Sequence, residues 1–303
     1  MSDAPQPTRS GRVALVGRPN VGKSTLLNAL LGEPLAIISP HPQTTREPVR
    51  GVLTRDTVQY VFVDTPGLHE ARTRLGHRMN DQARTQARQA DAVVLVAETR
   101  ADERDLALAG SLDELVGDVP AVLVLNKVDK LKDKALLLPV IAAFNDVRAF
   151  AAVVPMSARR GDGVDRLLGA LGELLPEQEM LYPPDTLSDQ PERFFVAELV
   201  REQILAHTRQ EVPHGVAVVI ERFEEGKTVT HIEVAVHVAR EGHKGILVGA
   251  RGSMMKAIGT AARMRVEKML GRKVHLAVRV RATPGWMDDA AKLAELGYGG
   301  DGT

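Results

Sequence analysis

The segment from Gly17 to Ser24, GRPNVGKS, constrains the fold of this chain more than any other segment. It fits the pattern G-x-x-x-x-G-K-[ST], in which glycines let backbone N–H groups close around phosphate oxygens. An apolar run at 13–16 precedes it. Residues 25–31 follow with apolar side chains at helical spacing, and Gly32 is placed to end that helix. A buried strand, a loop and a helix in this order predict a nucleoside triphosphate site at a helix N-terminus.

Within this loop each residue type has an expected task. Lys23 would reach the β- and γ-phosphates, and the Ser24 hydroxyl would bind Mg²⁺. The residues of this segment predicted to contact the nucleotide are Gly17, Arg18, Pro19, Asn20, Val21, Gly22, Lys23, Ser24 and Thr25.

Length and composition limit the class of protein. A chain of 303 residues suggests two domains, and the absence of cysteine excludes disulfides and fits a reducing cytosol. No apolar run reaches the roughly 18 residues of a membrane span, and the polar N-terminus has no signal core. We therefore expect a cytoplasmic monomer that binds no DNA and touches a membrane at most peripherally.

A second group of motifs predicts the metal and γ-phosphate contacts. Prolines are dense from Glu33 to Arg50, which predicts a long loop where a nucleotide-sensing switch would lie. In it Thr45 is the expected Mg²⁺ ligand, with Thr44 as the alternative. Strands predicted at 49–54 and 58–63 lead into the tetrapeptide Asp64, Thr65, Pro66 and Gly67.

The first and last residues of this tetrapeptide have separate predicted roles. Asp64 would hold Mg²⁺ through water, and the Gly67 N–H would bond the γ-phosphate. The predicted metal ligands are thus Ser24, Thr45 and Asp64, and Leu68 belongs to the predicted nucleotide site.

The base is predicted from the pattern N-K-x-D at Asn126–Asp129, which follows a strand expected at 121–125. The Asp129 carboxylate can accept from the guanine N1–H and exocyclic amine, which adenine cannot supply in that arrangement. Lys127 would lie over the base, and Asn126 would tie this loop to the phosphate loop. After a last strand, Ser157 and Ala158 would support the guanine. The nucleotide is predicted to be GTP, bound by a doubly wound, mostly parallel α/β sheet.

Catalysis lacks its usual water-orienting group. In small GTPases a glutamine follows D-x-x-G, and here Leu68 stands in that position. The expected catalytic residues are Lys23, Thr45, Gly67 and Asn20. Asn20 has two interpretations that the residues leave open: it coordinates a potassium ion beside the phosphates, or it satisfies backbone groups of the loop. His69 is either a base or, as we favour, a solvated switch histidine.

The second half of the chain is predicted to form a separate α+β domain. Residues 177–191 carry prolines and no periodicity, which indicates a linker. The order helix–strand–strand–helix–helix–strand follows. We therefore expect a flexible tail at 1–11, a nucleotide-binding domain at 12–176, and a second domain with a C-terminal extension at 192–303.

The second domain carries a G-x-x-G loop between two predicted helices. Its glycines would let the loop approach a nucleic-acid backbone, and its order of elements is that of a bacterial KH module. From residue 240 to 281 there are eleven Lys or Arg against two Glu, a net charge of +9 in a chain whose net charge is zero. This excess favours a polyanion, and the scarcity of aromatics favours backbone contacts over stacking. The predicted RNA-binding residues are Lys244, Gly249, Ala250, Arg251, Gly252, Lys256 and Arg263.

Together these motifs make the chain similar to the Era family of bacterial GTPases over nearly its whole length. The similarity rests on GRPNVGKS, QTTR at 43–46, DTPG, NKVD, the G-x-x-G region with Lys256-Ala257-Ile258-Gly259, and Gly285-Trp286 followed by Leu296-Gly297-Tyr298. The loop interior Ala250-Arg251 departs from the two polar or basic residues of many relatives.

The resemblance implies both ligands and functions. It implies GTP, GDP and Mg²⁺ as ligands, and binding to the 3′ end of 16S rRNA in the precursor of the 30S subunit, with a role in 16S rRNA processing and 30S assembly. It also implies release on hydrolysis and some peripheral inner-membrane association. Two other interpretations stay open: an rRNA-binding assembly scaffold whose nucleotide is mainly structural, and a membrane-associated regulatory GTPase. Trp286 is expected to anchor the end of the chain to the KH core.

Overall fold

The computed structural model describes residues 8–39, 41, 43–100, 102–208 and 212–299, and these form two compact units. The first is drawn mainly from residues before Gln190 and the second mainly from Gln190 onward. Residues 1–7 of the predicted tail, and Pro40 and Pro42 of the predicted switch loop, lie outside the described residues.

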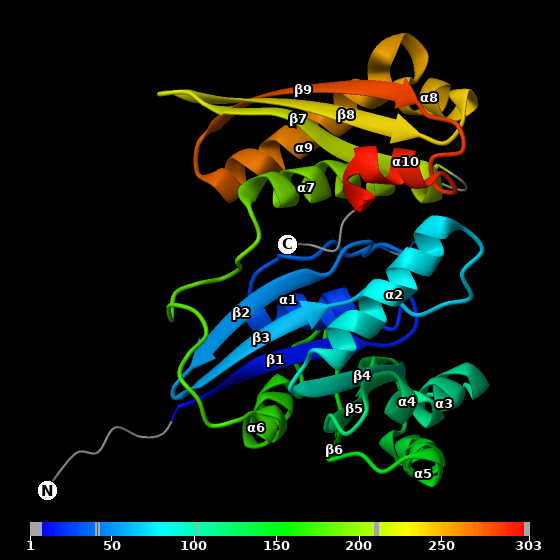
Figure 1. The fold of residues 1–303 in the computed structure, drawn as a ribbon, viewed down its shortest axis with the longest axis vertical. Coiled ribbons are helices and arrows are strands. Elements are labelled where there is room, and N and C mark those ends of the chain that lie inside the picture. The colour runs from blue at the N-terminus through cyan, green and yellow to red at the C-terminus, as the bar shows by residue number, and fades with distance from the viewer. Residues whose placement is uncertain (1–7, 40, 42, 101, 209–211, 300–303) are drawn as a thin grey trace, which may run out of the picture. The chain divides into compact units, whose positions relative to one another are not determined.

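The first unit contains a six-stranded sheet in the order β2-β3-β1-β4-β5-β6 (Figure 1). All neighbouring strands are parallel except β2 and β3, which form an antiparallel pair. The strands are β1 (Arg9–Val16), β2 (Val49–Arg55), β3 (Val58–Asp64), β4 (Ala92–Glu98), β5 (Ala121–Asn126) and β6 (Ala152–Pro155). The predicted doubly wound sheet is confirmed.

Helices cover both faces of this sheet because its central strands are apolar on both sides. The helices are α1 (Lys23–Leu31), α2 (Arg74–Arg88), α3 (Glu103–Gly110), α4 (Leu112–Val116), α5 (Leu137–Val147) and α6 (Val164–Leu174), with short 3₁₀ turns at Val128–Lys130 and Lys134–Leu136. Side chains of α2 to α5 pack with alternate residues of β1, β4 and β5 in one buried cluster. Since successive strand residues face opposite sides, the other alternate residues are left to the opposite face.

Two predicted boundaries need correction. β1 begins at Arg9, inside the tail predicted at 1–11. The predicted linker at 177–191 follows the first unit as far as Asp189: Gln59 Nε2 donates to the carbonyl oxygen of Tyr182, and Val52 N–H donates to that of Leu187. Its prolines prevent a regular helix or strand. The segment is nevertheless not a free linker, because hydrogen bonds to β2 and β3 hold it against the first unit.

The second unit has the predicted KH order. Its helices are α7 (Glu192–His207), α8 (Glu241–Val248) and α9 (Ser253–Leu270), followed by α10 (Ala290–Leu293) and a π-helical turn at Ala294–Tyr298. Its sheet has the order β7-β8-β9, formed by β7 (Val216–Glu225), β8 (Val229–Val238) and β9 (Lys273–Ala282). The strand β8 pairs antiparallel with β7 and parallel with β9. One face of the sheet packs on α7 and α9 in a buried cluster.

Trp286 anchors the C-terminal extension of this unit, as predicted. Its side chain is fully buried, its Nε1 donates to the carbonyl oxygen of Gly215 at 3.2 Å, and its ring stacks on Tyr298 at 5.7 Å between centroids. In the part of the chain that the structure describes, no helix is long and apolar enough to cross a membrane.

Candidate nucleotide site and KH groove

The phosphate loop joins the end of β1 to the start of α1. Lys23, the first residue of α1, is 6% exposed, and its Nζ donates to the carbonyl oxygens of Gly17 at 3.1 Å and Arg18 at 3.0 Å. Burial lowers the pKa of Lys23 to about 8, against the opposing effect of the Asp64 carboxylate. The Lys23 ammonium is therefore held among loop carbonyls, where a phosphate would give it a fully charged partner.

The three residues predicted to bind a metal meet beside Lys23. Ser24 Oγ donates to Asp64 Oδ2 at 2.7 Å, and Thr45 Oγ1 donates to the same oxygen at 3.0 Å. Asp64 is fully buried, which raises its pKa, and among the described residues its Oδ1 has no hydrogen-bond partner. A hard cation prefers oxygen ligands, so this buried carboxylate with an orphaned oxygen and two hydroxyls fits Mg²⁺.

The N-K-x-D segment is tied to the phosphate loop through Asn126. Its Nδ2 donates to the carbonyl oxygen of Val21 at 2.9 Å, and its Oδ1 accepts from the N–H groups of Lys127 and Ala158. Gly22 is required at this contact, because it has a φ of 104° and a Cβ there would lie 2.3 Å from Asn126 Nδ2. The predicted link between the two loops is present.

Asp129 is aimed by the segment after β6. Ser157 Oγ donates to Asp129 Oδ1 at 2.6 Å, and this hydrogen bond lowers the pKa of Asp129. An ionised carboxylate is the form that can accept two hydrogen bonds from guanine. The structure thus shows Ser157 bonded to Asp129 and Ala158 bonded to Asn126, the two residues predicted to act at the base.

The D-T-P-G segment approaches the other side of the phosphate loop. A Cβ at Gly67 would lie 2.7 Å from the backbone nitrogen of Pro19, so only glycine permits this approach. The Leu68 N–H donates to the carbonyl oxygen of Gly17 at 3.1 Å, and Thr65 Oγ1 donates to that of Leu15 at 2.7 Å. The structure therefore brings all three nucleotide motifs together at the ends of β1, β3 and β5.

The motif patterns did not predict three ion pairs at this site. Arg18 pairs with Asp102 at 3.0 Å and with Asp105 at 3.6 Å, both at the start of α3. Lys127 pairs with Glu98 at the end of β4, and its Nζ also donates to the carbonyl oxygen of Asn20. None of the three acids belongs to a short motif, and only the parallel order of β1, β4 and β5 predicts that these segments meet.

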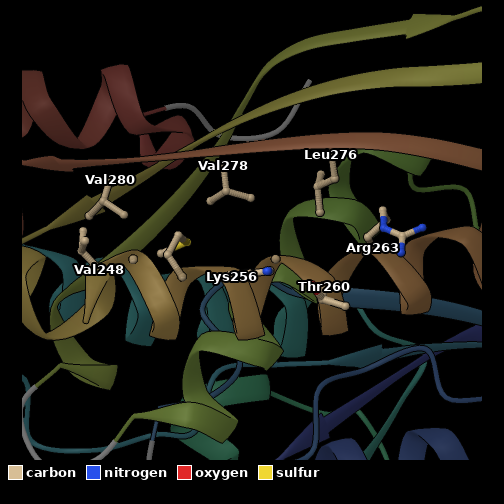
Figure 2. Close-up of a pocket in the computed structure, with 10 residues that line it drawn as sticks. Val248, Lys256, Thr260, Arg263, Leu276, Val278 and Val280 are labelled. Carbon is tan, nitrogen blue, oxygen red and sulfur yellow. The ribbon is translucent and has the colours of Figure 1, made fainter. Parts of the chain in front are cut away.

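In the second unit the G-x-x-G loop makes a tight turn between α8 and α9. Gly249, Arg251 and Gly252 all have positive φ, of 70°, 52° and 79°. Beside the turn is a groove of about 470 Å³ between α9 and β9 (Figure 2). It is lined by Val248, Gly252, Met255, Lys256, Gly259, Thr260, Arg263, Leu276, Val278 and Val280.

The groove is apolar on the strand side and polar along the helix (Figure 2). Lys256 and Arg263, both predicted to bind RNA, line it, whereas Lys244 does not and pairs instead with Glu241 at 3.3 Å. A groove with an apolar wall and cationic rim suits bases and phosphates of a single strand.

The charge excess of +9 counted along residues 240–281 is partly neutralised in the folded structure. Several of its arginines pair with acids from outside that window: Arg265 with Glu202, Arg272 with Glu192 and Glu225, Arg279 with Glu233, and Arg281 with Glu221. Among the described residues no ion pair holds Arg251 or Lys256, whereas Arg263 in the groove pairs with Glu267 at 3.1 Å. One positive charge at the loop and one in the groove are thus left outside any ion pair.

Comparisons with known proteins agree with both units. A family model described as a 50S ribosome-binding GTPase matches residues 12–127, and a KH domain model matches residues 211–286. GTPase Era of Xanthomonas axonopodis pv. citri is 46% identical over 300 residues, covering 98% of this chain and 100% of the relative. The chain belongs to the GTPase Era family.

Other members of the Era family match over comparable lengths. GTPase Era of Geobacter metallireducens is 43% identical over 303 residues, covering 98% of this chain and 100% of the relative. A solved Era structure in complex with MgGDPNP and nucleotides 1506–1542 of 16S ribosomal RNA has a TM-score of 0.92 and 36% identity, over 96% of this chain and 99% of that one. A variant of Aquifex aeolicus Era bound to GDP·AlF₄⁻ has a TM-score of 0.91 with the same identity and coverage. As a member of the Era family, this chain is a GTPase.

Proposed function

We propose that this chain is a GTP-driven switch that binds the 3′ end of 16S rRNA and assists assembly of the 30S subunit. The observation that carries the RNA assignment is the groove beside Gly249–Gly252, with Arg251 and Lys256 outside any ion pair among the described residues. The Era relative solved with nucleotides 1506–1542 of 16S rRNA supports the identity of the strand.

In the nucleotide site, the residues of this chain would bind, orient and sense GTP. The phosphate-loop backbone and Lys23 would surround the phosphates, Ser24, Thr45 and Asp64 would hold Mg²⁺, and Asn126, Lys127 and Asp129 would select guanine. When bound, Mg²⁺ would neutralise charge between the β- and γ-phosphates. The Gly67 N–H would report the γ-phosphate to the segment that follows.

The RNA assignment is tested with Arg251→Glu and with an RNA fragment matching the 3′ end of 16S rRNA. We expect the reversed charge to weaken RNA binding at least tenfold, because Arg251 lies at the tip of the loop, while GDP affinity stays unchanged. Arg193→Glu, at an exposed position of α7, is a matched control that makes the same change of charge. If Arg251→Glu bound RNA as tightly as the wild type, the Gly249–Gly252 loop would not contact the RNA.

We also propose that Asn20 helps to place a potassium ion beside the phosphates. Leu68 removes the usual water-orienting side chain, and Asn20 lies exposed in the phosphate loop with a φ of 65°. GTP turnover in potassium should exceed that in sodium at equal ionic strength, and Asn20→Ala should remove the difference. Equal wild-type rates in both salts would exclude a potassium role. Peripheral membrane association stays a prediction from the family resemblance, and a cytoplasmic location and a monomeric state stay predictions from the sequence.

The alternative is an rRNA-binding scaffold whose nucleotide is mainly structural. The apolar Leu68 favours it, because a site without a water-orienting side chain can bind GTP and turn it over slowly. A scaffold would bind RNA equally well with GDP and with a GTP analogue, whereas a switch requires a difference in affinity.

A further inference from the structure

The backbone after the D-T-P-G motif is held by an arrangement that the nucleotide motifs do not include. His69 Nδ1 lies 2.8 Å from the carbonyl oxygen of Gly67. The His69 N–H donates to Asn80 Oδ1 at 3.3 Å, and Asn80 Nδ2 donates to the His69 carbonyl oxygen at 2.7 Å. All these residues belong to the first unit.

The contact of His69 with Gly67 determines the tautomer of the ring. A carbonyl oxygen only accepts hydrogen bonds, so Nδ1 must carry the proton and act as donor. The peptide group between Gly67 and Leu68 is then held at both ends. Its oxygen accepts from the His69 ring, and its N–H donates to the carbonyl oxygen of Gly17 in the phosphate loop.

This restraint acts at a glycine, whose backbone angles are otherwise little restricted. Glycine has the widest range of backbone angles, and Gly67 must be glycine to approach Pro19. Holding the carbonyl oxygen of Gly67 restricts the ψ angle of the residue whose N–H would meet the γ-phosphate. A less mobile Gly67 favours catalysis, because preorganised donors stabilise developing charge without reorganising during the reaction. The His69 ring supplies the constraint that the glycine lacks.

Asn80 holds the next peptide in the same way from α2. Its amide donates and accepts at once, so it satisfies both the N–H and the carbonyl oxygen of His69. A carboxylate of the same shape could accept from the N–H but could not donate to the carbonyl oxygen. Asn80 therefore fixes the backbone that places the His69 ring.

We propose that His69 and Asn80 are positioning residues for GTP hydrolysis, which orient the Gly67–Leu68 peptide and link it to α2. This inference rests on the GTPase activity at the site. His69 acts in this proposal through its Nδ1–H on the backbone. Because Nε2 keeps a lone pair in this tautomer, base catalysis is the competing role, and the test has to separate the two.

Two substitutions of His69 separate positioning from base catalysis. In His69→Asn the side-chain amide can put an N–H where Nδ1 was, whereas in His69→Gln the amide reaches beyond it. We expect His69→Asn to keep kcat within about threefold and His69→Gln to lower it on the order of 10- to 100-fold, the scale of loss for a misplaced group. GDP affinity should stay unchanged in both, which also shows that they fold. His275→Asn, on the outer face of the KH sheet, is the matched control.

The tautomer can be measured without GTP. Long-range ¹H–¹⁵N spectra of the nucleotide-free protein should show the His69 proton on Nδ1. In Asn80→Asp the His69 signals should shift and kcat should fall, with GDP affinity retained. A proton on Nε2, or equal loss of kcat in His69→Asn and His69→Gln, would overturn the proposal. A wild-type protein that hydrolysed no GTP would instead contradict the function on which the proposal rests.

Discussion

At the scale of single residues, the predicted guanine site depends on side chains that neighbouring residues hold in place. Asn126 satisfies groups in the phosphate loop and beside Ala158, and Asp129 is oriented by Ser157. A substitution at such a residue can therefore weaken nucleotide binding directly, by removing a contact to the base, or indirectly, by removing the contact to the neighbouring residue. Substitutions that keep the shape but change the donors distinguish the two.

Asp129→Asn should lower GDP affinity on the order of 100-fold or more, because one of the two acceptor oxygens becomes an NH₂ group that faces a guanine donor and the negative charge is lost. Titration with a fluorescent GDP analogue measures this. Ser157→Ala should weaken binding far less, since it removes only the group that orients Asp129. If Asp129→Asn bound GDP like the wild type, Asp129 would not be the residue that reads the base.

At the scale of elements, the segment after α6 differs most from expectation. It returns along the antiparallel edge of the sheet, where the fully buried Gln59 satisfies both backbone groups of Tyr182 through Nε2 and Oε1. Arg50 pairs with Asp189 further along, at 2.8 Å. The segment therefore contributes to the stability of the first unit.

Gln59→Ala should lower the free energy of unfolding of the first unit by about 1 to 3 kcal/mol, because it leaves partly buried polar groups without partners. Urea unfolding with bound GDP as a reporter measures the change. Gln89→Ala, at an exposed position, should have little effect. Equal stability of the two variants would mean that Gln59 does not hold the segment after α6 against the sheet.

Trp286→Ala should destabilise the second unit by about 3 to 5 kcal/mol, the usual cost of removing a buried aromatic side chain. The stacking on Tyr298 and the hydrogen bond to Gly215 are both lost. Circular dichroism melts with and without GDP would report this. An unchanged GDP affinity is expected, and an unchanged melting profile would contradict the anchoring role.

At the scale of the whole molecule, sequence predicted the sites best where a motif and its element coincide. Gly22 and Lys23 follow a buried strand and open a helix, so their positions follow from local rules. Asn80 and Glu98 were missed because their roles depend on which strand and helix ends meet in space. The charge of the KH half was overestimated for the same reason, since Glu202 and Glu233 come from other elements to neutralise Arg265 and Arg279.

Salt dependence tests this revised charge. If Arg251 and Lys256, which are outside any ion pair among the described residues, each neutralise one phosphate, the logarithm of RNA affinity should fall with the logarithm of salt concentration with a slope of about −1.4, at roughly 0.7 per phosphate. Lys256→Ala should reduce that slope by about 0.7. A slope near zero would exclude phosphate contacts as the main source of affinity.

The central claim is that the bound nucleotide controls RNA binding. This claim requires a difference in RNA affinity between the GDP-bound and the GTP-bound states. The direct measurement is the affinity of the full chain for a 16S rRNA 3′-end fragment, with saturating GDP and with a non-hydrolysable GTP analogue, at fixed salt and Mg²⁺. We predict at least a fivefold higher affinity with the GTP analogue, the lower end of typical coupling between sites. Equal affinities in the two states would contradict the switch and leave an RNA-binding scaffold.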